Sequence, residues 1–78
     1  MGEEMEPEEK LTKAEQLIVD ILKKNGKPLS TYEIAKQAGI SWATVNVHCL
    51  KLKYMRVIEG SIQESKIGAK KMMWWLKK

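Results

Sequence analysis

The chain contains one histidine and one cysteine, and these two residues are neighbours, His48 and Cys49. A structural zinc site needs about four such ligands, so this pair cannot complete one. We interpret Cys49 as a small core hydrophobe and expect His48 either to pack at the core boundary or to face a phosphate. The sequence also shows no Ser/His/acid set, no paired carboxylates on a structured face and no glycine-rich phosphate loop. We therefore predict no enzymatic activity, no metal and no cofactor.

Residues 41–54 carry the side chains best suited to contact nucleic acid. Asn46 is the clear candidate for reading a base edge through hydrogen bonds. Ala43 and Val47 could lie against thymine methyl groups, which is an apolar form of major-groove readout. Phosphate contacts that fix the register are expected from two hydroxyl groups and an ammonium group: Ser41, Thr44 and Lys51.

The same segment also permits a protein partner. Its outward face is apolar and consists of Ala43, Val47, Leu50 and Tyr54. An uncovered apolar face is an aggregation liability, so either DNA or a protein surface should cover it. Trp42, at the edge of the core face, is expected either to pack against the preceding turn or to touch a sugar-phosphate edge.

Two consecutive helices joined by a tight turn must position these side chains. Ser30 with Glu33 forms a capping box that predicts a helix start at about residue 31. Gly39 ends that helix, because glycine accepts the left-handed conformation common at helix ends. Ser41 caps a second helix to about Tyr54, whose core-facing residues are Val45, Cys49 and Leu52. The pattern predicts a helix-turn-helix, a unit whose second helix enters a DNA groove.

A third helix and a hairpin complete the expected domain. Thr12 and Glu15 form another capping box, followed by an apolar core stripe of Leu11, Ala14, Leu17, Ile18, Ile21 and Leu22. Val19 lies off this stripe and is expected to be exposed or to contact a dimer partner. Pro28-Leu29 should form a short extended piece before the helix pair.

A strand is expected to begin at Arg56, followed by a polar loop or twisted hairpin over 60–68 and a return strand over 70–77. Period-2 alternation places Met72, Trp74 and Leu76 on the core side. Met73 and Trp75 would then lie on the outer side of the hairpin, unless the first helix or a second subunit covers them. An exposed pair of this kind suggests a dimer surface and makes a homodimer a further expectation. Three helices followed by such a hairpin make an α+β winged helix.

Charge is distributed unevenly along the 78 residues. Five of the ten acidic residues lie in 1–9, which we expect to form a flexible acidic tail. Residues 10–78 form the predicted domain and carry a net charge of +9, which attracts polyanions such as nucleic acid. The hairpin supplies Lys66, Lys70 and Lys71, and Lys66 at its tip is the preferred phosphate contact.

The length predicts a single small domain. We expect a cytoplasmic protein, associated with the nucleoid if it binds DNA as proposed above. No apolar run approaches the roughly 18 residues that span a bilayer, so no membrane partner is expected. The acidic start has no apolar core of a signal peptide. One cysteine excludes an internal disulfide, which is compatible with a reducing compartment.

Over residues 11–77 the sequence resembles the winged helix-turn-helix regulators of bacteria and archaea, including MarR-like and ArsR-like families. The spacing that carries the resemblance comprises Leu17, Leu22, 28–30, 34–35, 39–41, 44–45, Cys49, Leu52 and 57–58. Two positions depart from it: Cys49 stands where these families usually have Leu, and Arg56 where they often have Gly. The resemblance implies double-stranded DNA binding, probing the major groove with the second helix of the pair and the backbone with the wing.

Domains that recognise left-handed Z-form nucleic acid are also winged helices. Asn46 and Trp74 fall at positions that match their signature residues. Trp42 and Leu50, however, stand where those domains have Lys and Tyr. We therefore favour a transcription regulator that binds double-stranded DNA, and the alternative is a protein-interaction module in a transcription, replication or sorting complex.

Overall fold

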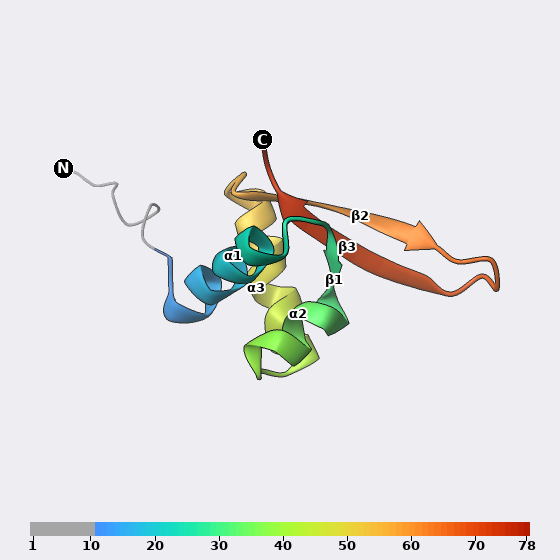
Figure 1. The fold of residues 1–78 in the computed structure, drawn as a ribbon, viewed down its shortest axis with the longest axis horizontal. Helices are drawn as coiled ribbons and strands as arrows, with labels where there is room; N and C mark the ends of the chain where they lie inside the picture. Colours follow the sequence, from blue (N-terminus) through green and yellow to red (C-terminus); the bar gives the residue numbers. More distant parts are fainter. Residues whose placement is uncertain (1–10) are drawn as a thin grey trace.

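The computed structural model describes residues 11–78, so the expected acidic tail over 1–9 lies outside the described residues. Three helices surround one end of a three-stranded antiparallel sheet, and two of the strands extend away as a long hairpin (Figure 1). The predicted α+β winged-helix fold is confirmed. The elements are α1 (Lys13–Asn25), β1 (Leu29–Ser30), α2 (Thr31–Ala38), α3 (Trp42–Tyr54), β2 (Ile58–Glu64) and β3 (Lys70–Leu76).

Both predicted capping boxes are present. Thr12 accepts a hydrogen bond from the Glu15 backbone N–H at 3.1 Å, and the Glu15 carboxylate accepts one from the Thr12 N–H at 3.0 Å. Ser30 and Glu33 make the same reciprocal pair at the start of α2. At the other end of α2, Gly39 adopts φ 72°, a left-handed conformation that costs glycine little. Sequence-local hydrogen bonds therefore fix where α1 and α2 begin.

Trp74 of β3 occupies the centre of the core and is fully buried. Its indole N–H donates a 2.8 Å hydrogen bond to the Thr31 hydroxyl, so the polar end of this large side chain is satisfied inside the protein. Helix and sheet residues pack around it, as expected for the core side of the hairpin: Ile18, Leu22, Leu29, Ile34, Val45, Leu52 and Ile58.

The predicted stripe of α1 was wrong at two positions. Val19 is buried, at 6% exposure, whereas Leu17 is 38% exposed. The buried face of α1 is centred on Ile18 and Leu22 and includes Glu15, one turn before Val19. It is therefore rotated toward Val19 and away from Leu17 relative to our expectation. Val19 is thus a core residue, and neither of the two roles expected for it holds.

The sheet contains a strand pairing that we did not predict. β1 pairs antiparallel with β3, with Leu29 opposite Trp74 and Ser30 opposite Met73. Met73, which we expected on the outer side of the hairpin unless another part of the protein covers it, is half-buried. Trp75, which was also expected outside, is half-buried as well.

The structure decides between the two forms expected over 60–68, a polar loop or a twisted hairpin. β2 continues through Glu64, which pairs with Lys70, so this region is a hairpin. The turn is confined to the residues between the strands, where the Ser65 N–H donates to the Ala69 carbonyl at 2.8 Å. This regular pairing carries the turn far from the core (Figure 1).

The chain enters this hairpin through Arg56, which has a positive φ of 66°. The predicted strand start was therefore two residues early, since β2 begins at Ile58. The families that this sequence resembles often have glycine at this position. Glycine suits it because a residue without a Cβ adopts a positive φ at little cost. Within residues 11–78, no helix is both long and apolar enough to cross a bilayer.

Candidate nucleic-acid interface

α3 is held on the domain by one side and left open on the other. Val45, Cys49 and Leu52 are fully buried, as the helical wheel predicted. Burial raises the pKa of the Cys49 thiol to about 12, so this cysteine stays protonated near neutral pH. The opposite side of the helix is therefore the part of α3 that a partner can reach.

That open side is apolar. Val47 is 64% exposed, Leu50 51% and Tyr54 88%, and Ala43 is exposed as well. These four residues lie about one turn apart along α3 and form a continuous apolar strip. We call this set, Ala43, Val47, Leu50 and Tyr54, the α3 strip.

Polar groups border the strip at the start of α3. The Ser41 hydroxyl accepts from the Thr44 backbone N–H at 3.1 Å and donates to the Thr44 hydroxyl at 2.8 Å. The Ser41 hydroxyl therefore donates its only hydrogen within the cap, whereas the Thr44 hydroxyl hydrogen stays available to an outside acceptor. Asn46 is half-buried, and no side chain among the described residues engages its amide.

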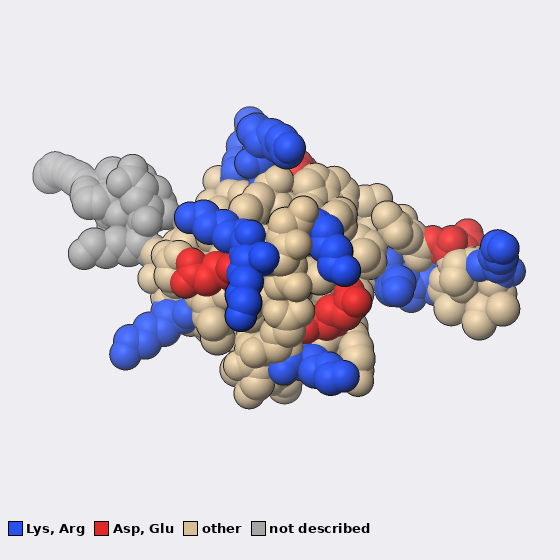
Figure 2. Space-filling model, in the orientation of Figure 1, with Lys and Arg blue, Asp and Glu red and all other residues tan. Residues whose placement is uncertain are grey.

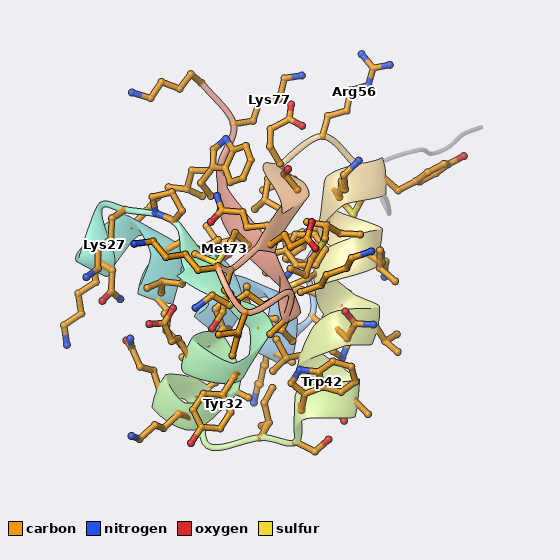
Figure 3. All side chains as sticks on the ribbon, turned by 90° about the vertical axis from the view of Figure 1, so that its right-hand side faces the viewer. Lys27, Tyr32, Trp42, Arg56, Met73 and Lys77 are labelled. Carbon is orange, nitrogen blue, oxygen red and sulfur yellow. The ribbon has the colours of Figure 1, made fainter. Side chains whose placement is uncertain are left out.

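Two aromatic side chains are exposed at the same end of the molecule. Trp42 belongs to the first turn of α3 and Tyr32 to the first turn of α2, and both lie at the lower end of the view in Figure 3. At 57% exposure Trp42 is only partly covered, which is compatible with either role expected for it. We did not single out Tyr32 from the sequence, although it follows the predicted N-cap Ser30 by only two residues.

A buried carboxylate links α1 to α3. Glu15 Oε2 lies 3.0 Å from His48 Nδ1 and 3.3 Å from Lys51 Nζ, and the Glu15 side chain is fully buried. Burial raises the pKa of this carboxyl, but hydrogen bonds from the Thr12 N–H, His48 and Lys51 outweigh burial and hold the pKa below its ordinary value. Lys51 remains 55% exposed, so its other ammonium hydrogens can reach a second anion.

We did not predict this contact between α1 and α3, because the capping box alone explains a glutamate at position 15. His48 was expected at the core boundary or facing a phosphate, and its half-buried ring does lie at the core boundary, with Nδ1 directed to Glu15. Within residues 11–78, no group of three or more His, Cys, Asp or Glu side chains could hold a metal ion.

The wing presents its cations at some distance from α3. Lys66 lies in the exposed turn and Lys70 begins β3 opposite Glu64. Figure 2 shows blue side chains and a red carboxylate together at the tip of the hairpin. Of the nine residues expected to contact DNA, seven lie on α3 or its N-cap, and Lys66 and Lys70 form a separate group on the wing.

Solved structures share this arrangement. A possible transcriptional regulator from Methanosarcina mazei Go1 superposes with a TM-score of 0.77 at 19% identity, covering 87% of this chain and 57% of that one. BpsR from Bordetella bronchiseptica, a protein whose DNA binding is regulated by 6-hydroxynicotinic acid, gives 0.72 at 23% identity, covering 88% and 50%. This chain thus spans roughly half the length of both regulators.

A third similar structure is nearly the same size as this chain. The Zalpha domain of Carassius auratus PKZ, solved in complex with Z-DNA, has a TM-score of 0.64 at 28% identity, covering 81% of this chain and 90% of that one. No curated protein matches the chain.

The sequence itself assigns the family. Residues 11–59, which run from the start of the described domain into β2, match the family model for winged helix-turn-helix DNA-binding domains. The helix-turn-helix, the hairpin and this match agree, and the chain belongs to the winged helix-turn-helix DNA-binding family.

Proposed function

We propose that this protein binds double-stranded DNA with α3 in the major groove and the hairpin along the adjacent backbone, and that it acts as a transcription regulator. The observation that carries the proposal is the open side of α3, which nothing in the described part of the chain covers. Membership in a DNA-binding family supports DNA as the partner of that open side. The similar regulators support the regulatory role.

The α3 strip and its neighbours divide into base contacts and phosphate contacts. The Asn46 amide, which no side chain within residues 11–78 engages, can donate and accept at an adenine edge, and Ala43 and Val47 can lie against thymine methyl groups. Thr44 has a free hydroxyl hydrogen for a phosphate. The remaining backbone contacts come from Trp42, Lys51, Lys66 and Lys70, all of which are exposed. The Ser41 hydroxyl was also expected to contact a phosphate, but its proton is already donated to Thr44, so we assign it the role of helix cap.

Selection of bound duplexes from a random pool tests this assignment. The selected site should contain at least one adenine whose preference relaxes in Asn46→Ala, with a loss of about 1–3 kcal/mol on the preferred site. Gln16→Ala, an exposed polar residue of α1, is the matched control and should leave the site unchanged. If Asn46→Ala and the unsubstituted protein select the same bases, Asn46 does not read a base.

The thymine contacts have an independent test. Replacing thymine by uracil in the selected site removes only the methyl group, so binding should weaken by about 0.8 kcal/mol for each buried methyl, roughly fourfold in affinity. In Val47→Ala the same base change should matter less, because the side chain that covers the methyl is shorter. Unchanged affinity for the uracil site would contradict apolar readout by the α3 strip.

The same binding experiments also test two other possible partners, left-handed DNA and a protein. The similarity to a domain bound to Z-DNA raises the left-handed form, but this chain has Trp42 and Leu50 at the positions where such domains have Lys and Tyr. An alternating C-G duplex held in the left-handed form should therefore bind no better than its right-handed counterpart. The exposure of Val47, Leu50 and Tyr54 favours a protein partner as the second candidate function, and absence of duplex binding at low salt would select it.

A further inference from the structure

A second concave site lies away from α3. It is a pocket of about 610 Å³ between the C-terminal end of α1, the loop that follows it, and the two strands of the hairpin. This volume falls within the roughly 300–1,000 Å³ typical of small-molecule sites. Its lining residues are Leu22, Lys23, Gly26, Lys27, Pro28, Gln63, Trp75, Leu76 and Lys78. None belongs to α3, and in Figure 3 Lys27 lies at the left edge of the molecule, whereas Trp42 of α3 lies to the lower right of its centre.

The chemistry of the lining is apolar and cationic. Leu22 is buried, Trp75 and Leu76 are half-buried, and Pro28 adds another apolar surface. Three lysines contribute to the same lining, and no carboxylate side chain does: they are Lys23, Lys27 and Lys78. A ligand of this pocket would therefore meet apolar walls and lysine side chains together.

Trp75 adds a hydrogen-bond donor. Trp74 satisfies its indole N–H through the Thr31 hydroxyl, whereas no residue within 11–78 accepts from the Trp75 indole N–H. Gln63 brings an exposed side-chain amide to the same pocket. A planar ring can stack on the Trp75 indole while its acidic group accepts from this N–H or from a lysine.

We infer that this pocket is a binding site for a small organic anion with a flat apolar body, such as an aromatic carboxylate. The lysines at the end of α1 also suit the negative end of the helix dipole, but that role does not require an apolar cavity between them and Trp75. The site is separate from the DNA interface, and its occupation does not depend on the proposed function.

Titration of the whole chain with 1-naphthoate tests the site, with neutral 1-naphthalenemethanol as the matched probe. The two probes share a ring system and differ in charge, so naphthoate should bind in a 1:1 ratio and about tenfold more tightly. In proton–nitrogen NMR spectra the indole N–H signal of Trp75 should shift on binding, and those of Trp42 and Trp74 should not. The Trp75→Phe variant identifies the signal.

Charge substitutions localise the site. Each lysine near the surface contributes less than about 1 kcal/mol, so the double variant Lys23→Gln/Lys27→Gln should bind naphthoate about fivefold more weakly. Lys36→Gln on α2, outside the pocket, should bind it normally. Gln63→Glu places a carboxylate in the lining, so it should weaken the binding of naphthoate more than the binding of the neutral alcohol.

Three results would overturn the inference: equal affinity for the two probes, equal affinity in the lysine double variant and the Lys36 variant, or naphthoate-induced shifts confined to Trp42. All variants are exposed-residue changes, except Trp75→Phe at a half-buried position, and their circular dichroism spectra verify that the fold is intact. Because no nucleic acid is present, failure of this test leaves duplex binding unaffected, and failure of duplex binding leaves this test valid.

Discussion

Glu15 shows how one side chain can serve two elements. Its carboxylate completes the capping box of α1 and also contacts His48 and Lys51 of α3. The orientation of α3 on the domain thus depends partly on a charge buried at the start of a different helix. Sequence spacing predicts the capping role, because it depends on residues three apart. The contact with α3 joins residues 33 and 36 apart, and no local pattern reports that distance.

Replacing Glu15 by Gln should destabilise the protein. The amide cannot match the negative charge that faces His48 and Lys51, so the free energy of unfolding at pH 7 should fall by about 1–3 kcal/mol in urea titrations. Asp20→Asn, an exposed acid on the same helix, is the control and should change stability by less than about 0.5 kcal/mol. A Glu15→Gln protein as stable as the parent would mean that the link to α3 contributes nothing.

The same contacts give the parent protein a defined pH dependence. The pKa of Glu15 is lower in the folded state than its ordinary value of 4.5, so this carboxyl stabilises the fold above that value. The contribution is lost as the pH falls through the folded-state pKa. Urea unfolding of both proteins should therefore show their stability difference narrowing below about pH 4.5. A difference that stays constant into the acid range would contradict the lowered pKa.

At the scale of elements, helix ends were predictable and sheet partners were not. Thr12, Ser30 and Ser41 mark their helix starts by short-range chemistry, and all three caps are present. β1 is only two residues long, Leu29–Ser30, and its pairing with β3 depends on a partner more than 40 residues away. The hairpin root depends on a further contact that the sequence cannot show, the one between Gly60 and Trp74.

Gly60 is required by the approach of Trp74. A Cβ built at Gly60 would lie 2.6 Å from two atoms of the Trp74 indole, which is itself fixed in the core. Gly60→Ala should therefore lower stability by about 1–3 kcal/mol, the usual cost of overpacking. Ser61→Ala, at the exposed neighbouring position, is the control for the same unfolding measurement. Equal stability of the two variants would show that the indole can move at little cost.

At Arg56 the situation is the reverse of that at Gly60: the backbone conformation favours glycine, but the chain has a residue with a side chain. Its φ of 66° is costly for a residue with a Cβ, so Arg56→Gly should raise the free energy of unfolding by roughly 0.5–1 kcal/mol. Arg56→Ala removes the same charge but keeps the Cβ, and it should show no such gain. A gain of equal size in both variants would assign the effect to charge and leave the backbone conformation without a role.

At the scale of the whole molecule, periodicity and capping signals predicted the fold, because a winged helix is assembled mostly from locally encoded pieces. They also predicted which face of α3 is open: Val47, Leu50 and Tyr54 are exposed and Val45 is buried. The rotation of α1 that buries Val19 arises from packing between elements, as does the pocket beside Trp75. A single sequence carries no direct signal for either.

Charge and shape together make the central claim testable at this scale. The hairpin carries Lys66 and Lys70 beyond the core, and α3 keeps its exposed side free, so the two groups can meet a duplex at separate places (Figure 1). A protein that neutralises phosphates releases counterions, and each phosphate contact adds about 0.9 to the slope of log affinity against log salt. Binding to a protein surface through the α3 strip would lack this steep dependence.

The most direct measurement is the affinity for a short random-sequence duplex, followed by fluorescence anisotropy between about 50 and 200 mM salt. We predict binding that weakens steeply with salt, with a slope reduced by about 0.9 in Lys66→Gln and unchanged in Lys24→Gln, an exposed lysine of α1. No binding at the lowest salt, or an affinity that does not vary with salt, would contradict the claim that this protein binds DNA.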